Sequence, residues 1–346
     1  MPEAIIDPDL PIIDPHHHLW DWRSRIPHLP PQTHPFEAIL RQSPRYLLDE
    51  LLADAGAGHN VVGTVYVQCG AFYRAEGPEA MKPVGETEFV NGVAAMAASG
   101  IYGVTRACAG IVGHADLGLG DAVADVLDAH IAAGGGRFRG IRHMMAHDDD
   151  PAVLGPLAHS VAGLCASPAV HAALRHFASR NLSLDLWVLE PQLPEVRALA
   201  KAFPDVAMVI DHVGTPVGLD RYAGQREERF TTWRASMAAL AELANVHVKL
   251  GGLGMPFPGF DGMGPDVRPS SETLATAWAP YIESCIELFG VGRCMFESNF
   301  PVDGWACDYP TLWNAFKRIA AGASADEKAA LFAGTAARFY RLEGTA

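Results

Sequence analysis

The regular alternation of short apolar, β-branched runs with segments of helical period constrains the fold most. Eight such runs are spread along the 346 residues, and their composition predicts buried strands. The predicted strands are Leu10–Asp14, Val61–Gln68, Tyr102–Val112, Phe138–Met144, Leu182–Leu189, Val206–His212, Val246–Leu250 and Cys294–Asn299. The predicted helices between them are Tyr46–Ala55, Gly120–Ala132, Val170–Ser179, Leu193–Ala202, Phe230–Ala244 and Tyr281–Leu288. This alternation predicts a parallel (β/α)₈ barrel.

An open, doubly wound sheet is the alternative architecture. Such sheets usually bind a dinucleotide through a G-x-G-x-x-G turn after the first strand, and the sequence has no such turn there. The Gly134–Gly136 run precedes a predicted strand instead of opening a helix. We therefore expect a single barrel domain over residues 1–346, with Ala325–Leu342 capping it as one or two helices.

Two connections are too long and too rich in glycine and proline to be tight turns. They are Trp20–Ser43, after the first strand, and Gly251–Ser270, after the seventh. Both begin at the carboxyl ends of strands, the face of a barrel where loops build active sites. They are predicted to be walls or lids of a pocket, with plain surface excursions as the alternative.

The composition excludes several classes of function. Hydrophobic residues make up 49% and charged residues 19% of the chain, so a large core can form. The 26 Lys and Arg against 40 Asp and Glu give a net charge of −14, which disfavours nucleic acids and anionic membranes as partners. The six cysteines include no C-x-x-C pair, and no apolar run is long enough to cross a membrane. We expect reduced thiols and a soluble, cytoplasmic protein.

Histidines mark the ends of two predicted strands. The first strand runs into Pro15-His16-His17-His18, where His16 and His18 point to one side because residues i and i+2 of an extended chain share a face. His17 faces the other way and is expected to be structural. His212 ends the sixth strand at the same face, and Asp211 is expected on the opposite side. Imidazoles in such a group bind metal ions or transfer protons, although a buried core histidine is the alternative for His212.

Charged and polar residues at the other strand ends complete the candidate site. Arg142 ends the fourth strand and suits a carboxylate or a developing oxyanion, or else an ion pair. Gln68 and Lys249 lie near the expected rim of the barrel. We expect them either to contact the substrate or only to line the barrel. On the eighth strand Glu297 and Asn299 share a face, with Glu297 deeper. A carboxylate there needs a metal ion, an imidazolium or Arg142 as a partner.

These motifs together resemble the amidohydrolase superfamily, and specifically its branch of predicted TIM-barrel hydrolases that includes fuconolactonase-like, pyrone-dicarboxylate-lactonase-like and sulfomuconolactone-hydrolase-like enzymes. The resemblance spans nearly the whole chain. It rests on Ile12–Trp20, Gly110–Leu117, Phe138–His143, Pro191–Pro194, Ile210–His212 and Lys249–Leu253. It implies a hydrolytic site centred on His16 and His18, in which Arg142 and His212 contact the substrate or polarise its carbonyl.

One departure from the family pattern affects the mechanism. Relatives usually follow the eighth strand with Gly-Ser-Asp-aromatic-Pro, whose Asp takes a proton from the attacking water. Here the matching stretch is Glu297–Pro301, with Asn299 at the Asp position. Asn is no general base, so Glu297 or the nearby Asp303 takes over, or the usual route is lost. The fourth strand has no lysine that could bridge two metal ions, and the fifth strand has no histidine. A binuclear metal centre is therefore not expected.

The leading hypothesis is a lactonase that opens a sugar-acid or aromatic-catabolic lactone by water attack. We expect His16, His18 and Glu297 to bind one divalent ion, with zinc as the leading candidate. Activity without a metal ion is the alternative. The rivals are a decarboxylase of an acidic substrate and a barrel that binds ligand without turnover because of Asn299. The expected partner is a small anionic or polar molecule, and the chain is expected to form a homo-oligomer or remain a monomer.

Overall fold

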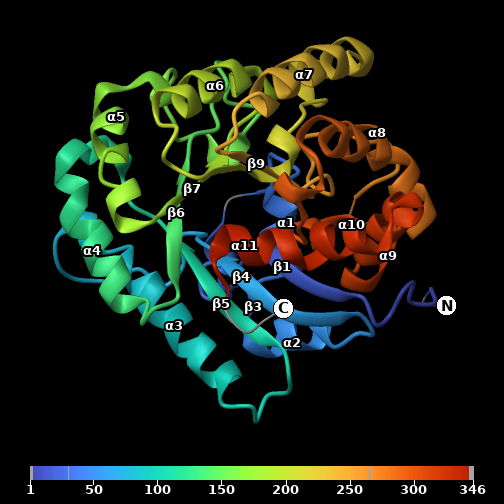
Figure 1. Ribbon diagram of the computed structural model, residues 1–346, viewed down its shortest axis with the longest axis horizontal. Helices are drawn as coiled ribbons and strands as arrows, with labels where there is room; N and C mark the ends of the chain where they lie inside the picture. Colours follow the sequence, from blue (N-terminus) through green and yellow to red (C-terminus); the bar gives the residue numbers. More distant parts are fainter. Residues whose placement is uncertain (1–2, 30, 265, 343–346) are drawn as a thin grey trace.

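Eight parallel strands form the centre of the computed structural model, which describes residues 3–29, 31–264 and 266–342. Each strand is hydrogen-bonded to the next along the chain, and the sheet curls into a barrel (Figure 1). The strands are β1 (Pro11–His17), β4 (Asn60–Val67), β5 (Arg106–Gly113), β6 (Phe138–Met144), β7 (Ser183–Trp187), β8 (Met208–Ile210), β9 (Val246–Leu250) and β10 (Cys294–Phe296). The predicted (β/α)₈ barrel is confirmed.

The barrel closes where β1 meets the residues that follow β10. The backbone N–H of Asn299 donates to the carbonyl oxygen of His16 at 2.8 Å, and the N–H of His18 donates to the carbonyl oxygen of Phe300 at the same distance. A parallel bridge between His17 and Phe300 lies between these two bonds. Closure thus places the β1 histidines directly beside the segment after β10.

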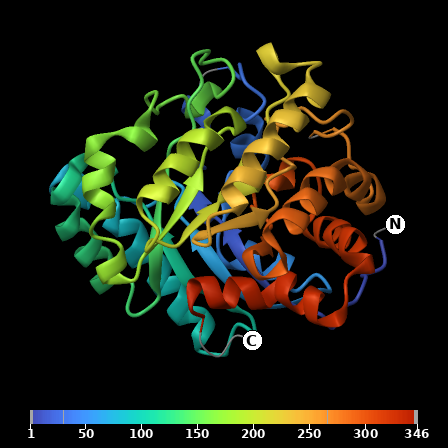
Figure 2. The same cartoon turned by 45° about the horizontal axis from the view of Figure 1, so that its top comes forward.

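Helices surround the barrel as an outer layer (Figure 2). They are α2 (Leu48–Ala55), α3 (Val84–Ala98), α4 (Val123–Ala133), α5 (Pro168–Leu174), α6 (Leu193–Ala202), α7 (Arg226–Ala241), α8 (Ser271–Phe289) and α9 (Tyr309–Ile319). The sequence did not predict α3 or α9, and it placed the start of α8 at Tyr281. Pro280, the residue before that predicted start, lies inside α8. In α3 the buried face includes small and polar residues, so its apolar stripe is weak.

Six of the eight predicted strands have different bounds in the structure, and in three of them positive φ angles explain where one end lies. Residues 102–105 do not belong to β5, because Gly100 and Gly103 turn the chain there at φ 80° and 102°. Strand β8 ends at Ile210, and His212 follows at φ 56°. Strand β10 ends at Phe296, before Asn299 at φ 54°. A left-handed residue breaks the extended geometry that a strand requires.

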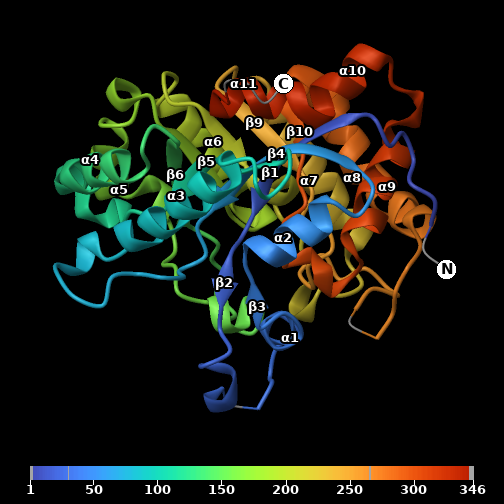
Figure 3. The same cartoon turned by 90° about the horizontal axis from the view of Figure 1, so that it is seen from below.

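The two ends of the barrel are covered by different parts of the chain (Figure 3). At the amino ends of the strands lie α10 (Ala325–Ala329), the π-helical turn η13 (Ala330–Gly334) and α11 (Thr335–Tyr340). These elements cap the barrel as predicted. At the carboxyl ends the Trp20–Ser43 connection projects as β2 (Trp20–Asp21), η1 (Ile26–His28) and α1 (Glu37–Gln42), and β2 pairs with β3 (Arg45–Tyr46).

Within the described part of the chain, no helix combines the length and the apolar character that a membrane crossing requires.

Candidate active site

His16 and His18 lie on the inner side of the barrel, at the carboxyl end of β1. Their ring centroids are 5.0 Å apart, and the ring of His16 lies 4.6 Å from that of His212. His17 points outward, where its Nε2 lies 2.8 Å from the hydroxyl of Thr64. The alternation expected from the sequence thus holds for all three β1 histidines, and His212 joins them as predicted.

Glu297 bridges two of these imidazoles. Its Oε1 accepts hydrogen bonds from Nδ1 of His212 at 2.7 Å and from the backbone N–H of His212 at 3.0 Å, and its Oε2 lies 2.8 Å from Nδ1 of His16. Burial opposes ionisation of Glu297, but the two imidazoles outweigh it and lower the pKa to about 2. Glu297 is therefore an ionised, fully buried carboxylate at neutral pH.

The hydrogen-bond partners define which ring nitrogen faces the cavity. Nδ1 of His18 lies 2.8 Å from the carbonyl oxygen of Val67, which can only accept, so this nitrogen carries the proton. By the same reasoning Nδ1 of His212 carries the proton donated to the carboxylate of Glu297. Burial lowers the pKa of His18 far below the usual range, so its ring is neutral. The Nε2 atoms of His18 and His212 are left as acceptors in the cavity that both rings line.

A layer of buried ion pairs lies deeper in the barrel, centred on Lys249. Its Nζ donates to Oδ2 of Asp185 at 2.7 Å and lies 3.0 Å from Oδ1 of Asp211 and 3.1 Å from Nδ1 of His16. Burial disfavours the ammonium, but the two aspartates outweigh it and raise the pKa of Lys249. The hydroxyl of Tyr340, from α11, donates to Asp185 at 2.6 Å.

The position of Asp211 corrects the sequence prediction, which put it opposite His212. Asp211 lies inside the barrel, on the same inward face as Val209 two residues earlier, and is fully buried. His212 reaches the interior as well because its positive φ takes it out of the strand's alternation. Asp185 was not among the predicted site residues, although a carboxylate between the apolar neighbours of a strand already indicates a buried charged partner.

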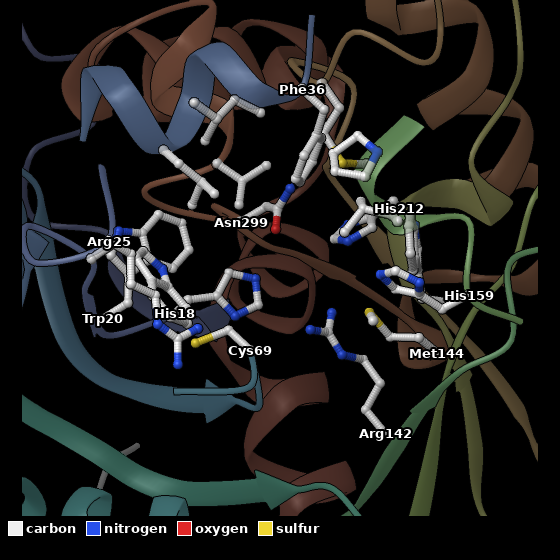
Figure 4. Close-up of a pocket in the computed structure, with 18 residues that line it drawn as sticks. His18, Trp20, Arg25, Phe36, Cys69, Arg142, Met144, His159, His212 and Asn299 are labelled. Carbon is white, nitrogen blue, oxygen red and sulfur yellow. The ribbon is translucent and has the colours of Figure 1, made fainter. Parts of the chain in front are cut away.

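Arg142 links the ion-pair layer to the cavity. Its Nη1 lies 3.3 Å from Nε2 of His16 and 3.8 Å from Oδ2 of Asp211, and its Nη2 donates to the backbone oxygen of Gln68. The guanidinium also lines the cavity (Figure 4). Neither Gln68 nor Lys249, both predicted to contact substrate, is among the described residues that line this cavity. Gln68 contributes its backbone oxygen, and Lys249 lies beneath.

Asn299 presents an acceptor to the cavity. Its Nδ2 donates to Oδ1 of Asp303 at 2.8 Å, so the amide oxygen is the atom left to face the open side (Figure 4). Asp303 also accepts the backbone N–H of Gly254 at 3.1 Å and is fully buried. Burial raises the pKa of Asp303 to about 7. Asp303 therefore supports Asn299 from behind and does not itself line the cavity.

The cavity has a volume of about 380 Å³ and opens at the carboxyl ends of the strands. Both long connections contribute to its walls, as the sequence predicted: Trp20–Ser43 through residues such as Trp22 and Phe36, and Gly251–Ser270 through Met255. Polar residues are few in the lining, which the structure defines as His18, Trp20, Trp22, Arg25, Phe36, Ile39, Leu40, Cys69, Arg142, Met144, Pro156, Leu157, His159, Trp187, His212, Met255, Asn299 and Val302.

The donor set of the barrel interior fits one divalent ion. The ligand atoms of His16, Asp211 and His212 lie within 4.8 Å of one another, and all three residues are buried. Neither carboxylate oxygen of Asp211 has a hydrogen bond of normal geometry, although the Lys249 ammonium is within ion-pair distance. Two imidazoles and a carboxylate are typical zinc ligands. This trio differs from the predicted His16, His18 and Glu297, because both oxygens of Glu297 already face His16 and His212.

Comparisons with known proteins identify the family of the chain. The family model described as Amidohydrolase matches residues 13–342. The uncharacterized protein y4mH of Sinorhizobium fredii is 36% identical over 337 residues, covering 96% of this chain and 99% of the relative. An L-fucono-1,5-lactonase of Burkholderia ambifaria is 30% identical over 337 residues, covering 96% of each chain.

A solved structure extends the similarity to three dimensions. An amidohydrolase from Burkholderia multivorans with bound zinc superposes with a TM-score of 0.71 at 25% sequence identity, covering 95% of this chain and 99% of the other. The match of the family model over almost the entire length, together with the relatives above, shows that the chain belongs to the amidohydrolase family.

Proposed function

We propose that the protein is a lactonase, which opens a cyclic ester by attack of water on its carbonyl carbon. The main observation behind this proposal is the pairing of His212 with Glu297. Nδ1 of His212 donates to the carboxylate at 2.7 Å, and Nε2 of His212 is left as an acceptor in the cavity. The 30% identical relative named L-fucono-1,5-lactonase supports the same class of reaction.

His212 acts as the general base in this proposal. Its Nε2 takes a proton from water, and the ionised Glu297 stabilises the imidazolium that forms, as the carboxylate of a catalytic triad does. This differs from direct proton abstraction by Glu297, which is too deep to line the cavity. The amide oxygen of Asn299 accepts the second hydrogen of the water and orients it. Asn299 therefore positions the nucleophile without acting as a base.

Arg142 stabilises the negative charge that develops on the carbonyl oxygen. Its guanidinium is fixed by the backbone oxygen of Gln68 and needs no rearrangement when the oxyanion forms. The tetrahedral intermediate then breaks the ring carbon–oxygen bond, and the leaving oxygen takes the proton from His212. The product is a hydroxy acid, whose carboxylate suits the same guanidinium.

We propose zinc as the divalent ion for which the barrel interior has suitable ligands. His16, Asp211 and His212 would hold it, with the predicted His18 and Glu297 beside them. When bound, such an ion polarises a carbonyl or lowers the pKa of a bound water. Because a metal ion and a proton exclude each other at the same nitrogen, His212 would act as the base only in protein without the ion. Activity that persists in the presence of chelator therefore tests the route through the base.

The other sequence expectations remain proposals about this enzyme. They are a small anionic or polar substrate, no nucleic acid or membrane partner, one domain over residues 1–346, a cytoplasmic location and a possible homo-oligomer.

The test is hydrolysis of a lactone panel by freshly purified, metal-analysed protein, with and without chelator, followed by release of acid. We expect ring opening by the wild type and its loss in His212→Asn. Release of carbon dioxide from an unsaturated carboxylic acid, with no lactone opened, would instead favour the decarboxylase. Turnover gained by Asn299→Asp in an otherwise silent protein would identify a binding barrel.

A further inference from the structure

The chemistry of the cavity lining restricts the substrate. The described lining contains no Ser, Thr, Tyr, Gln, Asp, Glu or Lys side chain. Its walls are aromatic and aliphatic, with Trp20, Trp22, Phe36, Leu40, Met144 and Trp187 as examples. The indole N–H of Trp20 is already donated to the backbone oxygen of Ser43 at 2.7 Å, whereas the indole nitrogens of Trp22 and Trp187 have no partner among the described residues but are buried. Hydroxyl groups of a bound ligand would therefore find few partners along the walls.

The polar lining residues are concentrated where the reaction takes place. His18, Arg142, His212 and Asn299 surround one part of the cavity (Figure 4), and the proposed mechanism uses Arg142, His212 and Asn299. Elsewhere the polar lining residues are Arg25 and His159, which are exposed. The guanidinium of Arg25 lies over the ring of Trp22, 4.5 Å from its centroid. The site thus has one reactive polar region, and the rest of a bound molecule would meet apolar walls.

Packing behind the walls holds them in place. Trp187 and Phe36 both pack on Phe257, with ring centroids 6.0 and 5.6 Å apart. Phe257 is fully buried in an apolar cluster that also contains Ile39 and Met255. This cluster gives the cavity a packed apolar surface, and such a surface gains from contact with apolar ligand atoms but leaves a buried hydroxyl unpaired.

We propose that the substrate is a lactone with an apolar body, such as an aryl or alkyl substituent, and not a polyhydroxylated sugar lactone. This inference rests on the proposed lactonase function and selects between its two substrate classes. It restricts the polar part of the expected anionic or polar substrate to the lactone group itself. It also separates the protein from the specificity that the name of its Burkholderia ambifaria relative states.

The test compares three δ-lactones at the same ring size: δ-valerolactone, its phenyl-substituted derivative and L-fucono-1,5-lactone. Each kcat/KM is divided by the rate of spontaneous hydrolysis, so that intrinsic reactivity cancels. We expect the phenyl lactone to exceed the unsubstituted ring by about tenfold or more, and the sugar lactone to be the poorest substrate. Equal or better turnover of the sugar lactone would overturn the inference and leave the lactonase function intact.

A wall variant with a matched control sharpens the comparison. Leu40 and Leu288 are both partly buried helical leucines, but only Leu40 lines the cavity. We expect Leu40→Gln to lower kcat/KM for the phenyl lactone by about tenfold, while Leu288→Gln retains the wild-type value. An equal loss in both variants, or none in Leu40→Gln, would contradict the proposed role of the wall.

A measurement of ligand binding without turnover tests the inference on ligand chemistry separately from the lactonase function. Quenching of tryptophan fluorescence by a phenyl-substituted δ-lactam, which resists hydrolysis, measures occupancy of the cavity whether or not the protein is a lactonase. Saturable quenching that Leu40→Gln weakens, in a protein that opens no lactone, would keep the inference on ligand chemistry and reject the lactonase function. No quenching by the lactam, with binding of the sugar lactone, would reject the inference.

Discussion

The two halves of the barrel interior differ sharply in composition. The half nearer the amino ends of the strands is apolar, with Ile13, Val65, Val112, Val209 and Met295 packed against Phe339 and other residues of the C-terminal helices. The half nearer the carboxyl ends holds histidines, carboxylates, Lys249 and Arg142. One sheet thus supports two environments, because two successive inward positions of a strand belong to different layers.

The charged layer is tolerated because its buried charges are paired. Three buried carboxylates, Asp185, Asp211 and Glu297, face one ammonium, one guanidinium and two imidazole N–H groups, so each charge has a partner. The apolar half below excludes water and is closed by α11. Tyr340 connects the halves, since its ring packs in the apolar cluster and its hydroxyl reaches Asp185.

The largest expected effect comes from the top of the charged half. His212→Asn removes the proposed base, and we expect kcat for lactone opening to fall by about 10²–10⁴ with the fold retained. Glu297→Gln should lose a similar factor, and the double variant should lose little more, because the two residues act as a unit. His176, which is half-buried on the outer surface and pairs with Asp121, is the control when changed to Asn. A loss below about tenfold in His212→Asn would exclude it as the base.

The centre of the charged layer should govern stability. Lys249→Met leaves Asp185 and Asp211 buried beside each other without their ammonium, and we expect the free energy of unfolding to fall by about 3–5 kcal/mol. The matched control is Arg234→Met, which breaks the exposed pair with Glu287 and should cost less than about 1 kcal/mol. Urea titration measures both. Equal stability of the Lys249 variant and the wild type would mean that this layer does not depend on its ammonium.

Asp303 makes the free energy of unfolding depend on pH. Its pKa is about 7 in the folded chain and is near 3.8 when unfolded, so the folded state holds its proton more tightly. This contribution to stability is fully present below about pH 4 and is lost as the pH rises through 7, by about 4 kcal/mol at most.

Asp303→Asn should therefore flatten the fall in unfolding free energy between pH 4 and 7. Exposed Asp261, changed to Asn, serves as the comparison, and thermal melts across that range provide the measurement. An unchanged pH profile in Asp303→Asn would show that the carboxyl titrates normally.

The smallest effect is expected at the junction of the halves. Tyr340→Phe removes one hydrogen bond to the carboxylate of Asp185 and keeps the ring in the apolar cluster, so we expect a loss of about 1.5–3 kcal/mol in stability. Tyr102→Phe, at a partly exposed position, should change nothing measurable. A strong loss of kcat with normal stability in Tyr340→Phe would place Tyr340 in the catalytic machinery instead.

The residues that sequence reasoning placed correctly lie where strand geometry is regular or nearly so. Alternation put His16, His18 and Glu297 on the inner face, and closure of the barrel brought them together as expected. Asp211 was misplaced because a left-handed residue follows it, which no periodicity indicates. The contact of Tyr340 with Asp185 joins positions 155 residues apart, and only the packed fold reveals it.

The expectations for Gln68, Lys249 and Asn299 show a second limit. Sequence position placed all three near the rim of the barrel, yet depth within the barrel separates them: only Asn299 lines the cavity. The role of Asn299 depends on Asp303, which fixes its amide orientation through a hydrogen bond. The orientation of an amide depends on the hydrogen-bond partners of the side chain, and these partners are known only once the loops are folded.

The paired strands β2 and β3 fasten the Trp20–Ser43 excursion at both of its ends, through Trp20 opposite Tyr46 and Asp21 opposite Arg45. The excursion can therefore be exchanged as a cassette between these anchor points without altering the strands that hold His212 and Glu297. Grafting another loop between β2 and β3 offers a way to retarget the enzyme toward other cyclic esters. The residues that transfer the proton, His212 and Glu297, would remain unchanged.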